Sequence, residues 1–79
     1  MKTEFPNYKL SKQEKEVVEH FENQSGFDLI YTGDVKNKKS FITCIKLNHD
    51  WLIDHAQEVV HLNERKLRKL KHYMDVVLD

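Results

Sequence analysis

Four side chains in the second half of the chain have the types and spacing of metal ligands on a helix. Asp54, Glu58 and His61 follow one another at intervals of four and three residues, and His55 lies one turn before Glu58. Carboxylate oxygens and imidazole nitrogens on one helical stripe can hold a transition metal. Zinc motifs, however, carry two His at i, i+4 or paired Cys, and neither pattern occurs here. We therefore predict no metal or cofactor site and interpret this stripe as a solvated face.

Nucleophilic catalysis has one candidate, Cys44, which is the only cysteine of the chain. Its position within an apolar run favours a small packed thiol over a nucleophile with a neighbouring base. The sequence has no Gly-rich phosphate loop, and a chain of 79 residues is short for a deep pocket. We therefore predict a protein without enzymatic activity. A single cysteine also excludes an internal disulfide and fits a reducing cytoplasm.

A basic segment is the strongest charge feature of the chain. Five of the seven residues from Arg65 to Lys71 are basic, which is compatible with phosphate contacts or with a solvated helix surface. The thirteen basic and thirteen acidic side chains of the whole protein cancel, which argues against a general nucleic-acid coat. A dimeric nucleic-acid-binding protein that uses the basic segment 65–71 is therefore the alternative hypothesis. Its candidate contacts are Lys36, Lys38, Lys39, Arg65, Lys66, Arg68 and Lys69.

The length predicts a single domain over residues 1–79 with a marginal core. Small domains are usually stabilised by disulfides, metals or oligomerisation, and oligomerisation is the option that this composition favours. No apolar run approaches the length of a membrane span, and the first ten residues lack the apolar core of a signal peptide. These observations predict a cytoplasmic protein that does not bind membranes.

The N-terminal part is predicted to be an arm followed by a helix. Residues 1–10 contain the only proline and no clear period, and Phe5 and Tyr8 are the side chains by which such an arm would pack. Ser11 followed by Glu14 is a capping-box signature, which predicts a helix over 11–25 that ends at a glycine, Gly26.

Residues 27–47 are predicted to form a β-hairpin. The runs "FDLIYTG" and "SFITCIKL" are rich in aromatic and β-branched residues that alternate with polar ones. The polar stretch "DVKNKK" between them contains Asn37, which is typical of a tight turn. The fold class is then α+β, with the order α-β-β-α.

Residues 48–78 are predicted to form one long helix, capped by Asn48. Apolar side chains recur there at the a and d positions of a heptad, which indicates a helix that pairs with a second helix. A fresh cap at Asn63 is the alternative, and it would break the helix near residue 63. The seam consists of Ile53, Ala56, Val60, Asn63, Leu67, Leu70, Met74 and Val77.

Together these features predict a small interaction protein, acting as a homodimer through its C-terminal helix and binding a protein partner. Regulators and inhibitors encoded by phages and mobile elements are often of this size and have no active-site motifs. This comparison is a general analogy with that class of proteins. Trp51 and Tyr73, large amphipathic residues close to the seam, are the candidate anchors for a partner.

Overall fold

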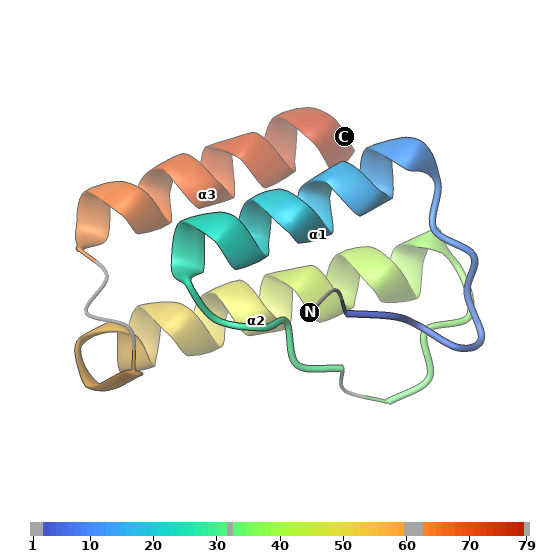
Figure 1. Cartoon of the computed structure of the whole chain (residues 1–79), viewed down its shortest axis with the longest axis horizontal. Coiled ribbons are helices and arrows are strands. Elements are labelled where there is room, and N and C mark those ends of the chain that lie inside the picture. Colours follow the sequence, from blue (N-terminus) through green and yellow to red (C-terminus); the bar gives the residue numbers. More distant parts are fainter. Residues whose placement is uncertain (1–2, 32, 60–62, 79) are drawn as a thin grey trace.

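The structure, a computed structural model, describes residues 3–31, 33–59 and 63–78, and these residues form three helices (Figure 1). Helix α1 spans Lys12–Ser25, α2 spans Lys38–Val59 and α3 spans Glu64–Leu78. Helices α1 and α2 run in the same direction, and α3 returns antiparallel beside them. The described residues contain no strand, so the predicted α+β class with its α-β-β-α order is wrong: the fold is all-helical.

The predicted β-hairpin over residues 27–47 is replaced by an irregular loop and by the first half of α2. Asn37, the predicted turn residue, caps α2 instead, because its side-chain oxygen accepts from the backbone N–H of Ser40 at 2.9 Å. Phe41, Ile45 and Leu52 are spaced by four and seven residues and are fully buried on one side of the helix. This helical stripe overrides a strand preference that differs from helix preference by only tenths of a kcal/mol per residue.

The loop between α1 and α2 lies against α2 through a buried amide. Asn48, in the middle of α2, is 4% exposed and pairs with the backbone of Ile30. Its Oδ1 accepts from the Ile30 N–H and its Nδ2 donates to the Ile30 carbonyl, both at 2.8 Å. The same Nδ2 donates to the carbonyl of Cys44, one turn earlier, at 2.8 Å. The predicted helix cap is thus a clamp that holds an extended segment to a helix.

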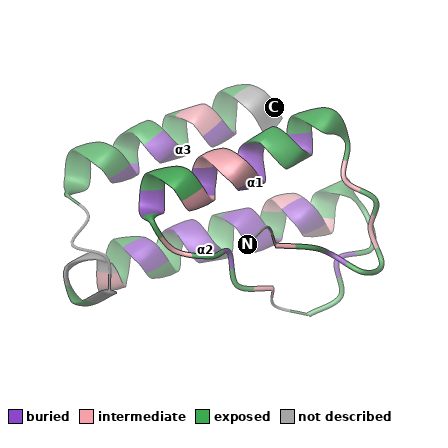
Figure 2. Ribbon diagram, in the orientation of Figure 1, coloured by how far each residue is buried: buried purple, intermediate pink, exposed green. Residues whose placement is uncertain are grey.

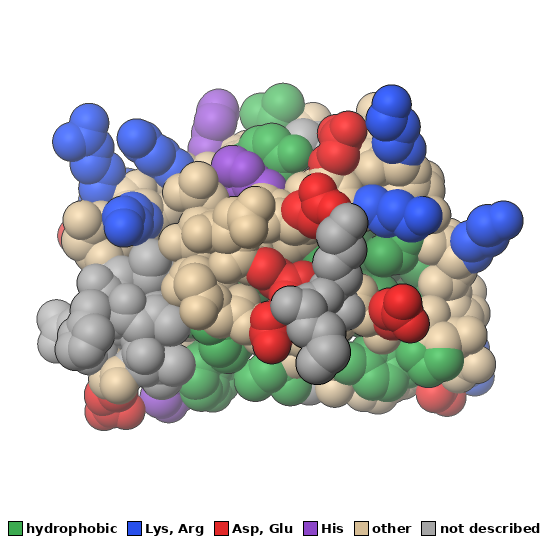
Figure 3. Space-filling model, in the orientation of Figure 1, with side chains coloured by type: hydrophobic (Ala, Val, Ile, Leu, Met, Phe, Trp, Pro, Cys, Tyr) green, Lys and Arg blue, Asp and Glu red, His purple; other side chains and the backbone are tan. Residues whose placement is uncertain are grey.

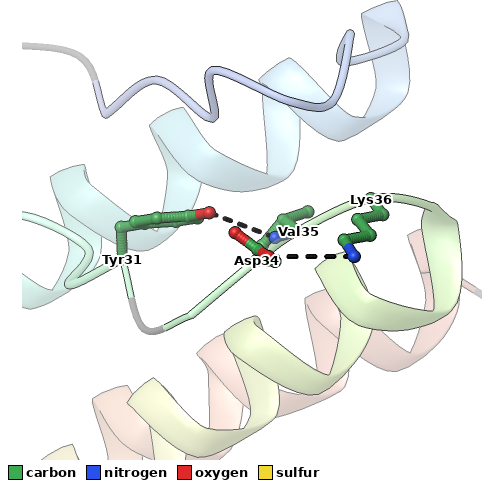
Figure 4. Close-up of polar contacts among 4 residues, drawn as sticks. All are labelled: Tyr31, Asp34, Val35 and Lys36. Atoms are coloured by element: carbon green, nitrogen blue, oxygen red, sulfur yellow. Dashed lines mark hydrogen bonds and ion pairs between the residues drawn. The ribbon is translucent and has the colours of Figure 1, made fainter.

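Farther along the loop, two local contacts shape the approach to α2 (Figure 4). The backbone N–H of Val35 donates to the phenol oxygen of Tyr31 at 3.2 Å, and Lys36 lies 3.8 Å from Asp34. Val35 is 1% exposed, so this turn places an apolar side chain in the core.

The predicted helix over 48–78 is two helices. Helix α2 ends at Val59, and α3 begins at Glu64 after a segment, 60–62, that lies outside the described residues. Asn63 caps α3, since its side-chain oxygen accepts from the Lys66 N–H at 2.9 Å. The alternative prediction, a new helix capped by Asn63, is therefore the arrangement observed. None of the helices in the described part of the chain is long and apolar enough to span a bilayer.

Buried side chains line the inner sides of all three helices (Figure 2). Phe21 of α1, Phe41 of α2 and Leu70 of α3 are each at most 1% exposed. His49 joins α2 to α3, because its Nε2 lies 3.2 Å from the carbonyl oxygen of Leu67. That contact satisfies a ring nitrogen of a side chain that is 4% exposed.

The N-terminal arm packs on the core through the two residues that the sequence singles out. Phe5 contacts Phe41 edge to face at 5.5 Å, and Tyr8 stacks on the same ring at 5.9 Å. The Tyr8 hydroxyl donates to the carboxylate of Glu14, which is 5% exposed. Glu14 also completes the predicted capping box, since its Oε1 accepts from the Ser11 N–H at 2.8 Å.

The hydrogen-bonded pair of Tyr8 and Glu14 makes the stability of the fold depend on pH in both the acidic and the alkaline range. Burial acts to raise the pKa of Glu14, but hydrogen bonds from Tyr8 and Ser11 lower that pKa below its ordinary 4.5. Burial, together with the Glu14 carboxylate, raises the pKa of Tyr8 from 10.0 to about 12. The contribution of Glu14 to the free energy of unfolding is therefore complete above pH 4.5 and is lost as the pH falls through the pKa of Glu14 in the folded protein. The contribution of Tyr8 is complete below pH 10.0 and is lost as the pH rises toward 12.

We expect the melting temperature of the wild type to exceed that of Tyr8→Phe by a constant amount between pH 4.5 and 10.0. The difference should shrink below and above this range, because protonation of Glu14 or ionisation of Tyr8 weakens the hydrogen bond. Thermal unfolding followed by circular dichroism at a series of pH values measures it. A difference that stays constant at every pH would contradict this account.

Candidate binding surfaces

The predicted heptad seam does not form one surface. Leu67, Leu70 and Met74 are at most 6% exposed and belong to the core of the chain itself. Ile53, by contrast, is 50% exposed on α2, and Asn63 is the exposed cap of α3. Of the remaining seam residues, Val60 lies outside the described residues, and the side chains of Ala56 and Val77 are not described. The part of this face that Leu67, Leu70 and Met74 form on α3 is thus covered by α1 and α2.

A different apolar surface is open to solvent on α2 and the preceding loop. Leu47 is 54% exposed, Ile30 46% and Trp51 36%. Leu47 and Trp51 are one turn apart on α2, and the Asn48 clamp places Ile30 next to them. In Figure 3 hydrophobic side chains gather along the lower edge of the molecule, on the α2 side. We call the surface formed by Ile30, Leu47 and Trp51 the α2 stripe.

Trp51 is held in the stripe by aromatic stacking. Its ring lies 5.4 Å from that of Phe27, at an interplanar angle of 10°, and 4.5 Å from the His55 ring at 13°. The Nδ1 atom of His55 lies 2.9 Å from the Trp51 carbonyl oxygen, which fixes the outer ring of the stack. Trp51, a candidate anchor from the sequence, is partly packed and still 36% exposed to solvent. Such a fixed aromatic ring loses little conformational entropy on binding.

Carboxylates continue this face of α2 beyond Trp51. Asp54 and Glu58 follow Trp51 by three and seven residues, which places them on the same side of the helix, and both are exposed. His61, which shares this helical face and was considered as a third metal ligand, lies outside the described residues. Within the described residues no cluster of three potential metal ligands occurs. These carboxylates therefore give the apolar stripe an acidic edge.

A second surface is the groove between α1 and α3, which we call the α1–α3 groove. Its wall on α3 includes Arg65, Lys69 and His72, and its wall on α1 includes His20 and Gln24. Figure 3 shows Lys and Arg side chains projecting at the end of the molecule where α3 begins, with His side chains beside them. Of the basic residues of α3, Arg65, Arg68 and Lys69 line this groove, whereas Lys71 lines a cavity between α2 and α3.

Tyr73, the other predicted anchor, lies at the base of this groove. It is half-buried and stacks on His20, with ring centroids 3.7 Å apart and an interplanar angle of 21°. Burial lowers the pKa of His20 below its ordinary 6.5, so this imidazole is neutral at pH 7. Tyr73 therefore joins α3 to α1 and is not part of the α2 stripe.

The lysines assigned to the hairpin tip lie far from the α1–α3 groove. Lys38 and Lys39 belong to the first turn of α2, and Lys36 precedes them and pairs with Asp34. Helix α2 begins at the end of the molecule opposite to the end where α3 begins (Figure 1). The structure thus brings together Arg65, Arg68 and Lys69 of α3, but it does not bring the two basic segments together.

Cys44, the one candidate nucleophile, belongs to the hydrophobic core. Cys44 is 2% exposed, and its Sγ lies 3.7 Å from the Ile30 carbonyl oxygen, as expected for a packed thiol. Sequence reasoning missed Ile30 and Leu47 because it placed both in a hairpin. It missed His20 and Gln24 as well, although their spacing of four residues on a predicted helix indicates a shared face.

Comparison with models of known protein families, with curated proteins and with solved structures finds no match to this chain. The two surfaces are therefore interpreted from their own chemistry.

Proposed function

We propose that the chain is a small non-enzymatic protein that regulates or inhibits a protein partner by occupying one of its surfaces. The observation that carries the proposal is the α2 stripe, where three large apolar side chains are between 36% and 54% exposed and the Asn48 clamp holds Ile30 to the same part of α2 as Leu47 and Trp51. Contiguous exposed apolar surface costs solvation free energy, and in soluble proteins it marks binding sites. Tryptophan at the centre of such a surface is a common energetic anchor of interfaces.

The charges around the stripe specify the partner further. Asp54 and Glu58 flank Trp51 on the C-terminal side of α2, and Asp28 follows Phe27 in the loop; all three are exposed. A partner of complementary chemistry would have an apolar centre that receives Trp51 and basic residues at its rim. Three cations of α3, Arg65, Arg68 and Lys69, line the α1–α3 groove instead and would not oppose such a partner.

Photo-crosslinking in the cells that naturally encode the chain tests this proposal. With a photoreactive amino acid in place of Leu47, we expect one discrete covalent adduct with another protein. Replacing Asp54 by Lys should reduce that adduct about tenfold, because it reverses a rim charge on a side chain that makes no core contact. Mass spectrometry of the adduct identifies the partner.

The matched control has the photoreactive residue at Gln13, an exposed position of α1. The same adduct from Gln13, or an adduct that Asp54→Lys leaves unchanged, would contradict the proposal. An adduct of twice the 9.5 kDa mass of the chain would show that the stripe binds a second copy instead.

A further inference from the structure

We propose that the α1–α3 groove binds the phosphodiester backbone of a single-stranded nucleic acid. This site is separate from the α2 stripe, so its test is independent of the test for the proposed protein partner. Its ligand class follows from three properties of the groove: a row of cations along one wall, the placement of the nearby carboxylates, and the polar and aromatic groups on the other wall.

Two cations and a histidine form a continuous row on α3. Arg65, Lys69 and His72 succeed one another at intervals of four and three residues, and all three are exposed. This spacing keeps them on one helical face, with Arg68 beside them. From Arg65 to Val76, the last residue of the wall, the helical rise gives a groove about 16 Å long. Such a row can follow the phosphates of one strand.

The carboxylates of α3 leave most of this row free to bind an anion. Glu64 accepts from Arg68 at 2.7 Å, so this pair partly neutralises itself on the helix surface. Asp75 lines another cavity, between α2 and α3, together with Lys71. Among the described residues that line the α1–α3 groove, none is acidic. The positive potential of Arg65 and Lys69 is therefore concentrated there, although the whole chain is neutral.

The opposite wall carries groups suited to bases rather than to phosphates. Gln24 offers an amide that can donate and accept hydrogen bonds, and His20 is neutral and stacks on Tyr73. Cations that follow the backbone, combined with aromatic rings beside them, are typical of single-strand binding surfaces. A duplex presents its bases stacked inside, so only the cationic wall would contact it.

Fluorescence anisotropy with a labelled oligothymidine of about 12 nucleotides tests the site. The wild type should bind with an affinity that falls steeply as salt increases. The double variant Arg65→Gln/Lys69→Gln should bind about tenfold more weakly, and the slope of log K against log salt should decrease in magnitude by about 1.4, the value expected for two phosphate contacts. A duplex of the same length should bind more weakly than the single strand.

The control variant is Lys38→Gln/Lys39→Gln, which removes the same charge from exposed positions at the other end of the molecule. It should bind like the wild type. Equal losses in both variants, an unchanged salt slope in the groove variant, or no binding by the wild type at low salt would each overturn the proposal. Equal affinity for an oligoglutamate would also overturn it, because the site would then recognise any polyanion. Circular dichroism of both variants verifies that they are folded.

Discussion

Replacing Phe41 by Ala should lower the free energy of unfolding by about 4 kcal/mol, the typical loss for a buried phenylalanine. Phe41 is fully buried, and its ring contacts both Phe5 and Tyr8 of the N-terminal arm. A domain of this length has a total stability of about 4 to 12 kcal/mol. The variant should therefore unfold at a much lower urea concentration than the wild type, or be partly unfolded without urea. Urea denaturation followed by circular dichroism measures the loss.

Leu47→Ala is the matched control, and it also separates a helix from a strand. In a hairpin, Phe41 and Leu47 would lie on the same face and both would be buried. In α2 they lie on different faces, and Leu47 is 54% exposed. Leu47→Ala should thus change stability by no more than about 0.5 kcal/mol. Comparable losses in the two variants would contradict the helical structure of residues 38–47.

Replacing Asn48 by Ala should lower stability by about 3 kcal/mol, although Asn48 is polar and lies in the middle of a helix. The variant removes the side-chain amide that pairs with the N–H and the carbonyl of Ile30, and both of these hydrogen bonds are partly buried. Leu29 and Val35 lie in the same loop and are at most 4% exposed, so loosening the loop also weakens the core. Urea denaturation gives the overall loss.

Hydrogen exchange supplies a local readout for the same variant. The Ile30 amide should be protected in the wild type and should exchange much faster in Asn48→Ala, because Asn48 Oδ1 is its acceptor. Asn23→Ala, at an exposed position of α1, should leave both stability and this amide unchanged. An Ile30 amide that exchanges equally fast in all three proteins would show that the clamp does not form.

The clamp also matters for the proposed partner surface. Asn48 fixes Ile30 beside α2, and Ile30, Leu47 and Trp51 form the stripe only while the loop is held there. An interface that is ordered before binding loses less conformational entropy when the partner binds. We therefore expect variants of Asn48 to weaken partner binding as well as stability.

Local signals in the sequence determined the features that depend on neighbouring residues. Ser11 and Glu14 predicted the start of α1, and Gly26, with a positive φ of 69°, occupies its left-handed cap. The hydrogen-bonding capacity of Asn63 raised a break as the alternative to a long helix. These features could be predicted from the sequence because a capping side chain contacts backbone groups only a few residues away.

Only the tertiary structure decided whether residues 38–47 form a helix or a strand. It also decided whether each heptad position is exposed to solvent, buried in the core of the chain or available to a partner. The run "SFITCIKL" satisfies both periods, so its preference was set by the long-range packing of Phe41 on Phe5 and Tyr8. Leu67, Leu70 and Met74 have the spacing of a dimer seam, but their partners are α1 and α2 of the same chain. An apolar stripe specifies that a surface must be buried, whereas which surface covers it depends on the path of the whole chain.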